Sequence, residues 1–183
     1  QTNAHQTGER HTWTGSASEG RPTLAALYAA AKAPNAPIAL RMGKINELAA
    51  QCNNAPVIAA DATSVEDLEN LFTKAMEHFG GKVDFVLHSI GMSPNVRKGF
   101  AYTDTNYDNF LKTLDISALS FHKVMQTAFK LDAINEWGSV VALSYIAAQR
   151  TFPGYNDMAE AKALLESIAR SFGYHYGVHK KVR

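Results

Sequence analysis

From Asn35 onward, short apolar runs alternate with longer stretches whose apolar residues recur every three or four positions. The apolar runs fall at residues 56–60, 83–88 and 139–143, and each is short enough to be a buried strand. Helical spacing marks residues 38–50, 65–79, 106–133 and 156–176. Because crossover helices between parallel strands produce this alternation, the sequence predicts an α/β fold with a doubly wound parallel sheet.

The first 34 residues differ from the rest of the chain. Residues 1–22 are rich in Thr, Gly, Ser, His and Arg and contain no apolar run of strand length, and residues 24–32 could form a short Ala-rich helix that no strand precedes. We therefore expect two regions: an irregular segment at residues 1–34 and a partial α/β domain at residues 35–183.

Composition excludes several classes of function. The formal net charge of the 183 residues is +1, so no basic surface for a nucleic-acid backbone is expected. No apolar run reaches the length of a membrane span, and the N-terminus lacks the pattern of an export signal. The single cysteine, Cys52, fits a reducing compartment, so a cytoplasmic location is expected.

Candidate ligand-binding residues follow the predicted strands, because open parallel sheets bind ligands beyond the carboxyl ends of their strands. Asp61 follows the first strand, and its carboxylate could accept a hydrogen bond from an adenine amino group. The alternative is that Asp61 caps the helix that comes next. Gly91 follows the second strand, where it would let the backbone approach a ligand closely or would simply form a turn.

Two tyrosines and a lysine form the most informative group. Tyr155 and Lys162 are seven residues apart, so at about 100° per residue both would project from one face of the final helix. Tyr145 enters the same region from the end of the third strand. A nearby ammonium would stabilise a phenolate and make the phenol a better donor to a developing oxyanion. The alternative is that both tyrosines are packing residues and the lysine is solvated.

Other polar residues support no site of their own. His175 and His179 are four residues apart but have no acidic third ligand nearby, so no metal site is expected. His88 is interpreted as a structural histidine at a strand end. Ser144 lacks the turn motif of a hydrolase nucleophile.

Three stretches of this sequence resemble the enoyl-acyl-carrier-protein reductases of the short-chain dehydrogenase superfamily. They read DATSVEDLENLFTKAMEHFGGKVDFVLHSIGMS, LDISALSFHKVMQTAFK and ALSYIAAQRTFPGYNDMAEAKALLESIAR. The resemblance covers about residues 35–183. In this family six residues stand between the tyrosine and the lysine, as they do between Tyr155 and Lys162. In ordinary short-chain dehydrogenases three residues stand between them, and Ala159 occupies the position where that lysine would be.

The resemblance implies a Rossmann-like sheet and a catalytic role for the three residues already singled out. Tyr155 would donate to the enolate oxygen that forms when a trans-2-enoyl thioester is reduced. Lys162 would bind the nicotinamide ribose, and Tyr145 would line the same substrate pocket. The other matching positions are Asp61 and Ala62 for adenine, Ser89, Ile90 and Gly91 for the loop over the cofactor, and Ser93 beside the acyl substrate.

The same resemblance implies the cofactor and the partners. NADH is the expected cofactor, and NADPH stays open because no residue decides between the two. The expected substrate is an enoyl group carried on acyl carrier protein in fatty-acid biosynthesis. Intact members of the family form homotetramers.

Two departures from the family pattern suggest an incomplete fold. The first strand and glycine loop are not recognisable in HTWTGSASEGRPTLAAL, and the family's C-terminal strands and substrate flap would follow Arg183. The chain as given is therefore expected not to turn over enoyl thioesters. A catalytically silent fragment and another short-chain dehydrogenase, such as a ketoacyl reductase, remain as alternatives.

Overall fold

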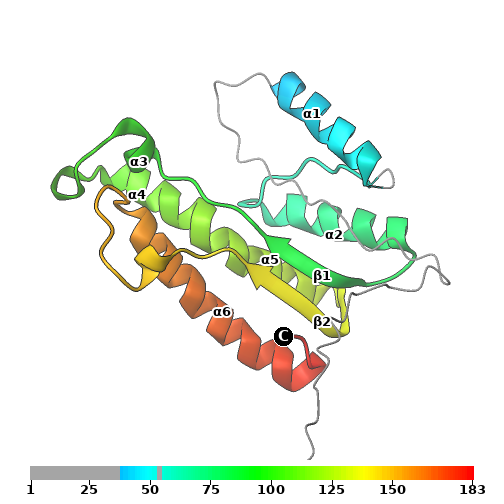
Figure 1. The fold of residues 1–183 in the computed structure, drawn as a ribbon. Coiled ribbons are helices and arrows are strands. Elements are labelled where there is room, and N and C mark those ends of the chain that lie inside the picture. The colour runs from blue at the N-terminus through cyan, green and yellow to red at the C-terminus, as the bar shows by residue number, and fades with distance from the viewer. Residues whose placement is uncertain (1–37, 53–54) are drawn as a thin grey trace, which may run out of the picture.

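Two parallel strands lie side by side with helices packed against them (Figure 1). The computed structural model describes residues 38–52 and 55–183. Its elements are α1 (Ile38–Gln51), α2 (Val65–Phe79), β1 (Val83–His88), α3 (Pro94–Lys98), η1 (Tyr102–Asp104), α4 (Tyr107–Leu114), η2 (Asp115–Leu119), α5 (Ser120–Lys130), β2 (Ile134–Ala142), η3 (Ile146–Ala148) and α6 (Met158–Lys180).

The two strands confirm the predicted parallel pairing of the second and third apolar runs. Leu87 pairs with Val141, and the register shifts near the start of the ladder, between Val83 and Phe85. Trp137 adopts a left-handed backbone with φ of 66° next to that irregularity. At the opposite end, the carboxyl ends of β1 and β2 lie together and lead into the loops that carry the candidate site (Figure 1).

Alternation along β1 separates a packed face from an open one. Val86 and His88 are each 2% exposed, whereas Phe85 and Leu87 are 47% and 45% exposed. The buried side chains join the sheet to α2, α5 and α6 in one core. Its largest buried members include Leu68, Phe72, Val86, Ile134, Leu165 and Tyr176. This core fixes where α6 begins relative to the strand ends.

The helix predicted at residues 65–79 forms with those bounds. Ser64 caps it by accepting a hydrogen bond from the Asp67 N–H, and Gly80 ends it with a left-handed φ of 67°. The long helix predicted at 106–133 also forms, but in three parts. A π-helical turn at Asp115–Leu119 separates α4 from α5.

The strand predicted at residues 56–60 is wrong. Only Ala60 makes a bridge, and residues 55–59 are irregular. Apolar character alone does not make a strand, because a strand also needs a neighbour on its hydrogen-bonded edge, and the two-stranded ladder does not include this segment. Ile58 and Ala60 nevertheless pack against the core.

The chain's last residues pair with β2. Arg183 N–H donates to the Gly138 carbonyl over 3.1 Å, and Val140 N–H donates to the Arg183 carbonyl over 2.7 Å. These bonds agree with the expectation that a further strand begins near Val182. The segment 1–34 and the expected lack of a central strand there lie outside the described residues.

Candidate functional site

Lys162 lies in the first turns of α6 with its side chain turned inward to the end of β2. The residue is 6% exposed, and its ammonium donates to the carbonyl of Leu143 over 2.7 Å. Burial lowers the pKa of the Lys162 ammonium below its usual range. The ribose-binding role of this ammonium stays a prediction.

The backbone at Gly91 lies close to the side chain of Lys162. A Cβ added at Gly91 would lie 3.5 Å from Lys162 Nζ and 2.7 Å from the terminal methyl of Met158. A side chain there would therefore crowd both residues, so Gly91 is needed for packing against α6, and its predicted approach to a ligand stays a prediction. The loop after β1 and the start of α6 thus meet, as their places at the carboxyl ends of parallel strands predicted.

Tyr145, two residues after the Leu143 carbonyl that Lys162 binds, forms an aromatic pair with Tyr155. Their ring centroids are 4.6 Å apart with an interplanar angle of 39°. Phe152 packs against both rings, with centroids 5.5 Å from Tyr145 and 6.4 Å from Tyr155. Sequence reasoning missed Phe152, since a single apolar residue in a loop has no periodic signal.

Tyr155 does not lie on the final helix, which corrects the argument from helical spacing. It precedes the first residue of α6, in a turn where its N–H donates to the Phe152 carbonyl. Asn156, with a left-handed φ of 42°, lies between Tyr155 and Met158, so the helix does not extend back to Tyr155. Tyr155 is brought to the site by stacking on Tyr145 instead.

The charge environment of Tyr155 also differs from the expectation. Burial, and then the neighbouring Tyr145, raise the pKa of the Tyr155 phenol above its usual value. An ammonium close to the phenol would lower that pKa, and Lys162 makes no such contribution here, so the activation of Tyr155 by Lys162 stays a prediction. The phenol stays protonated at neutral pH and can act as a neutral hydrogen-bond donor.

His88 is a neutral structural residue, as interpreted from the sequence. Burial and the Lys162 cation lower its pKa from 6.5 to about 4, although a backbone hydrogen bond acts in the other direction. Its Nε2 lies 2.9 Å from the Ser120 hydroxyl, which itself donates to the Ile116 carbonyl over 2.6 Å. Because that hydroxyl hydrogen is already used, Nε2 carries the proton and donates to Ser120.

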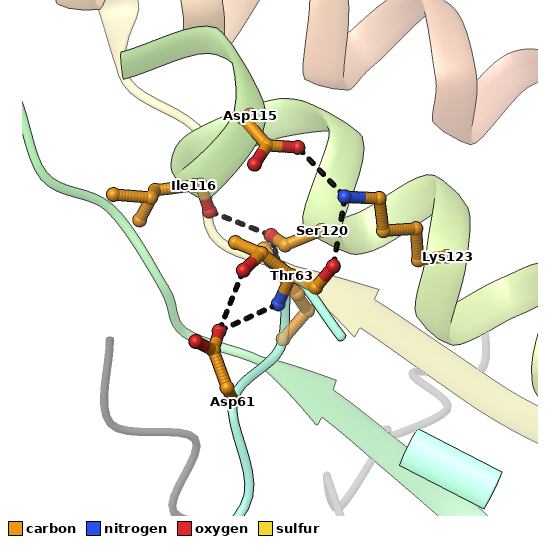
Figure 2. A network of polar contacts seen from close by, with 7 residues as sticks. Asp61, Thr63, Asp115, Ile116, Ser120 and Lys123 are labelled. Carbon is orange, nitrogen blue, oxygen red and sulfur yellow. Dashed lines mark hydrogen bonds and ion pairs between the residues drawn. The ribbon is translucent and has the colours of Figure 1, made fainter. Parts of the chain in front are cut away.

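Asp61 anchors a turn in the polar network of Figure 2. Its Oδ1 accepts from the N–H of Thr63 over 2.9 Å and from the Thr63 hydroxyl over 2.8 Å. Lys123 joins this turn to the π-helical turn, donating to the Thr63 carbonyl over 2.9 Å and to Asp115 over 2.7 Å. The Asp61 carboxylate forms this local turn and does not cap α2, whose cap is Ser64, and the adenine roles of Asp61 and the buried Ala62 stay predictions.

The remaining loop residues are held by internal bonds. Ser117 accepts from the Met92 N–H over 2.9 Å and donates to the Met92 carbonyl over 3.1 Å. Ser93, 5% exposed, caps α3 by accepting from Val96 N–H and donates to Asp157 over 2.5 Å. Ser89 is exposed and Ile90 is half-buried. The substrate role of Ser93 and the cofactor roles of Ser89 and Ile90 remain predictions.

A separate groove lies between α5 and α6, away from the tyrosine–lysine site. It has a volume of about 550 Å³ and is lined by both helices, including His122, Phe129, Phe172, His175 and His179. Among the residues that the structure describes, no group of three or more acidic, histidine or cysteine side chains is arranged to hold a metal ion.

Comparison with known proteins identifies the family. A family model described as enoyl-(acyl carrier protein) reductase matches residues 25–183. The chain belongs to the enoyl-acyl-carrier-protein reductase family. Within this family, the NADH-named reductase 1 of Rhizobium meliloti (strain 1021) is 38% identical over 117 residues, which cover 64% of this chain and 42% of that protein.

Solved structures of the enoyl-acyl-carrier-protein reductases agree in fold. The crystal structure of FabI from Alistipes finegoldii has a TM-score of 0.77 and 71% identity, and the match covers 81% of this chain and 57% of that one. FabI from Aquifex aeolicus VF5 has a TM-score of 0.72 and 30% identity, with 81% and 57% covered. The chain thus spans about half the length of the relatives it matches, and its α/β fold is a partial, Rossmann-like one.

Proposed function

We propose that this chain carries the catalytic site of an NADH-dependent enoyl-acyl-carrier-protein reductase of fatty-acid biosynthesis. The observation that supports it most is the junction of Gly91 with Lys162 at the carboxyl ends of two adjacent parallel strands, where Lys162 binds the Leu143 carbonyl two residues before Tyr145, the partner of Tyr155. The relatives are named for this reaction with NADH.

The residues present suit the proposed cofactor. The absence of a side chain at Gly91 lets Met158 and Lys162 pack against the loop, and the Lys162 ammonium lies beside this backbone with its pKa lowered by burial. We assign Lys162 to the ribose hydroxyls and Ser89, Ile90 and Gly91 to the surrounding loop. When bound, NADH supplies the hydride that adds to the β-carbon of the enoyl thioester.

Tyr155 stabilises the negative charge that develops on the substrate. Its phenol is protonated at neutral pH, since its pKa is raised, so it donates to the thioester oxygen as that oxygen gains negative charge. Tyr145 stacks on Tyr155 and limits where the phenol can point. Phe152 packs against both rings and adds apolar surface beside the phenol.

A chimera tests this assignment directly. Residues 55–183 would replace the aligned segment of Alistipes finegoldii FabI, and NADH absorbance would be followed with a crotonyl thioester. We expect substrate-dependent oxidation, and a loss of about 100-fold or more in kcat when Tyr155→Phe removes the donor. Tyr174→Phe is the matched control, because Tyr174 is 69% exposed on α6. Preferred turnover of an acetoacetyl thioester would instead favour a ketoacyl reductase.

The cofactor preference is proposed from the relatives. NADH appears in the names of the curated reductases and in one complex of the Alistipes finegoldii enzyme, whereas a Bacillus cereus relative was solved with NADP⁺. Measuring kcat/KM of the chimera for both cofactors decides this point. A higher value with NADPH would contradict the NADH assignment.

We also propose a cytoplasmic location and a homotetramer, as the resemblance implies. The groove between α5 and α6 supports assembly, because the apolar side chains of Phe129 and Phe172 line it. In the described ranges, none of the helices is both long and apolar enough to cross a membrane.

A further inference from the structure

Asp157 is a fully buried carboxylate directly before α6. Its exposed fraction is 0%, and it lies in the chain between Tyr155 and Lys162. Oδ1 accepts from the Ser93 hydroxyl over 2.5 Å. Oδ2 accepts from the Asn95 amide over 2.8 Å and lies 2.8 Å from the Thr113 hydroxyl, whose hydrogen is shared with the Asn109 carbonyl. Both oxygens of the carboxylate are therefore used.

The donors to Asp157 come from segments that also shape the candidate site. Ser93 follows Met92, whose backbone N–H and C=O are both bonded to Ser117 of the π-helical turn. Asn95 belongs to α3, and it also donates to the Asn106 carbonyl at the start of α4. One carboxylate thus joins the loop after β1, two helices and the first residues of α6.

Met158, the residue after Asp157, links this hydrogen-bonded cluster to Gly91. Met158 begins α6, and its terminal methyl would lie 2.7 Å from a Cβ at Gly91. Lys162, one turn further along the helix, lies beside the same glycine. A shift of the loop relative to α6 would therefore alter the separation between the Gly91 backbone and the Lys162 ammonium.

The cluster suits a carboxylate. Ser93 and Asn95 each donate to Asp157, Thr113 shares its hydroxyl hydrogen with it, and a carboxylate offers acceptors only. In Asp157→Asn, the amide N–H₂ would replace either the acceptor of the Ser93 hydroxyl or the acceptor of the Asn95 amide, so one buried donor would lose its acceptor. Such an uncompensated buried donor is costly, and the loop would relax to avoid it.

We propose that Asp157 is a positioning residue of this site, whose carboxylate fixes the Gly91–Ser93 loop against the start of α6 and so sets the cofactor-binding geometry at Gly91 and Lys162. Its link to NADH rests on the proposed function, whereas its hold on the loop does not.

The test compares Asp157→Asn with Asp132→Asn in the 183-residue chain. Asp132 is a matched control, since it is a carboxylate paired with Lys82 and Lys180 at the opposite end of β2. Amide hydrogen exchange would be measured at residues 89–96 and, as an internal reference, at residues 68–76 of α2. NADH affinity would be measured by fluorescence in parallel.

Asp157→Asn should speed exchange at residues 89–96 by about fivefold to a hundredfold and leave residues 68–76 unchanged. NADH affinity should fall over the same range, and Asp132→Asn should change neither quantity. If Asp157→Asn does not fold, Ser93→Ala provides the test, with the same direction and a smaller effect.

Two results would overturn the positioning role: unchanged exchange at residues 89–96, or equal acceleration in α2, which would mean general destabilisation. A faster loop with unaltered NADH affinity in a chain that binds NADH would also overturn it. Local acceleration in a chain that binds no NADH even as wild type would count against the proposed function and support the hold of Asp157 on the loop.

Discussion

The contribution of His88 to the stability of the fold depends on pH, because His88 is buried at the end of β1. Its folded pKa of about 4 lies below the unfolded value of 6.5, so the folded state resists protonation. Stability is therefore fully present above pH 6.5 and is lost as pH falls from 6.5 towards 4. Between pH 7 and pH 5 the loss from this group should be about 2 kcal/mol. Urea unfolding of wild type and His88→Gln measures it, since Gln keeps a donor for Ser120 but does not titrate; equal pH slopes would contradict the assignment.

Lys162 offers a second prediction at the same scale. Lys162→Met keeps the aliphatic stem but removes the ammonium that lies beside Gly91. We expect NADH affinity to fall about tenfold or more. The unfolding midpoint should change little, because the loss of one hydrogen bond is offset by the removal of a partly desolvated charge. NADH titration and thermal unfolding check the two parts. Unchanged affinity would remove Lys162 from the cofactor site.

Among the elements, β2 depends on a glycine inside the strand. A Cβ at Gly138 would lie 2.7 Å from Ile134 Cγ2, 3.0 Å from the Asn135 carbonyl oxygen and 3.1 Å from the Asp84 carbonyl oxygen. Two of these neighbours are backbone atoms and cannot move freely. Gly138→Ala should therefore lower the free energy of unfolding by about 1–3 kcal/mol. Gly81→Ala is the control, because open space surrounds that position; a similar effect in both variants would show that crowding at β2 is not the cause.

At the scale of the whole molecule, the groove between α5 and α6 predicts self-association. Ser171 lines that groove and is exposed, so Ser171→Arg places a bulky charge in it. Under the proposed assembly, sedimentation should show smaller species for Ser171→Arg than for wild type. Thr73→Arg, on the exposed side of α2, should leave the mass unchanged. Assemblies of equal size in all three proteins would exclude this groove as the contact.

The sequence by itself determined the α/β class, the bounds of α2 and β1, and the parallel pairing of β1 with β2. These features follow from local signals: Ser64 and Gly80 cap α2, and apolar runs of strand length specify buried strands. The family was also recognisable, because the six-residue separation of Tyr155 and Lys162 is a property of the sequence.

Only the tertiary structure decided how those residues meet. Tyr155 lies outside α6 because a turn precedes the first residue of that helix. The pKa of its phenol is raised by burial and then by the neighbouring Tyr145. Residues 55–59 are irregular because strand formation depends on a pairing neighbour, which a single segment cannot specify. The role of Asp157 was likewise hidden, since its donors come from residues 44 to 64 positions away along the chain. Long-range contacts of this kind are fixed by packing and not by local spacing.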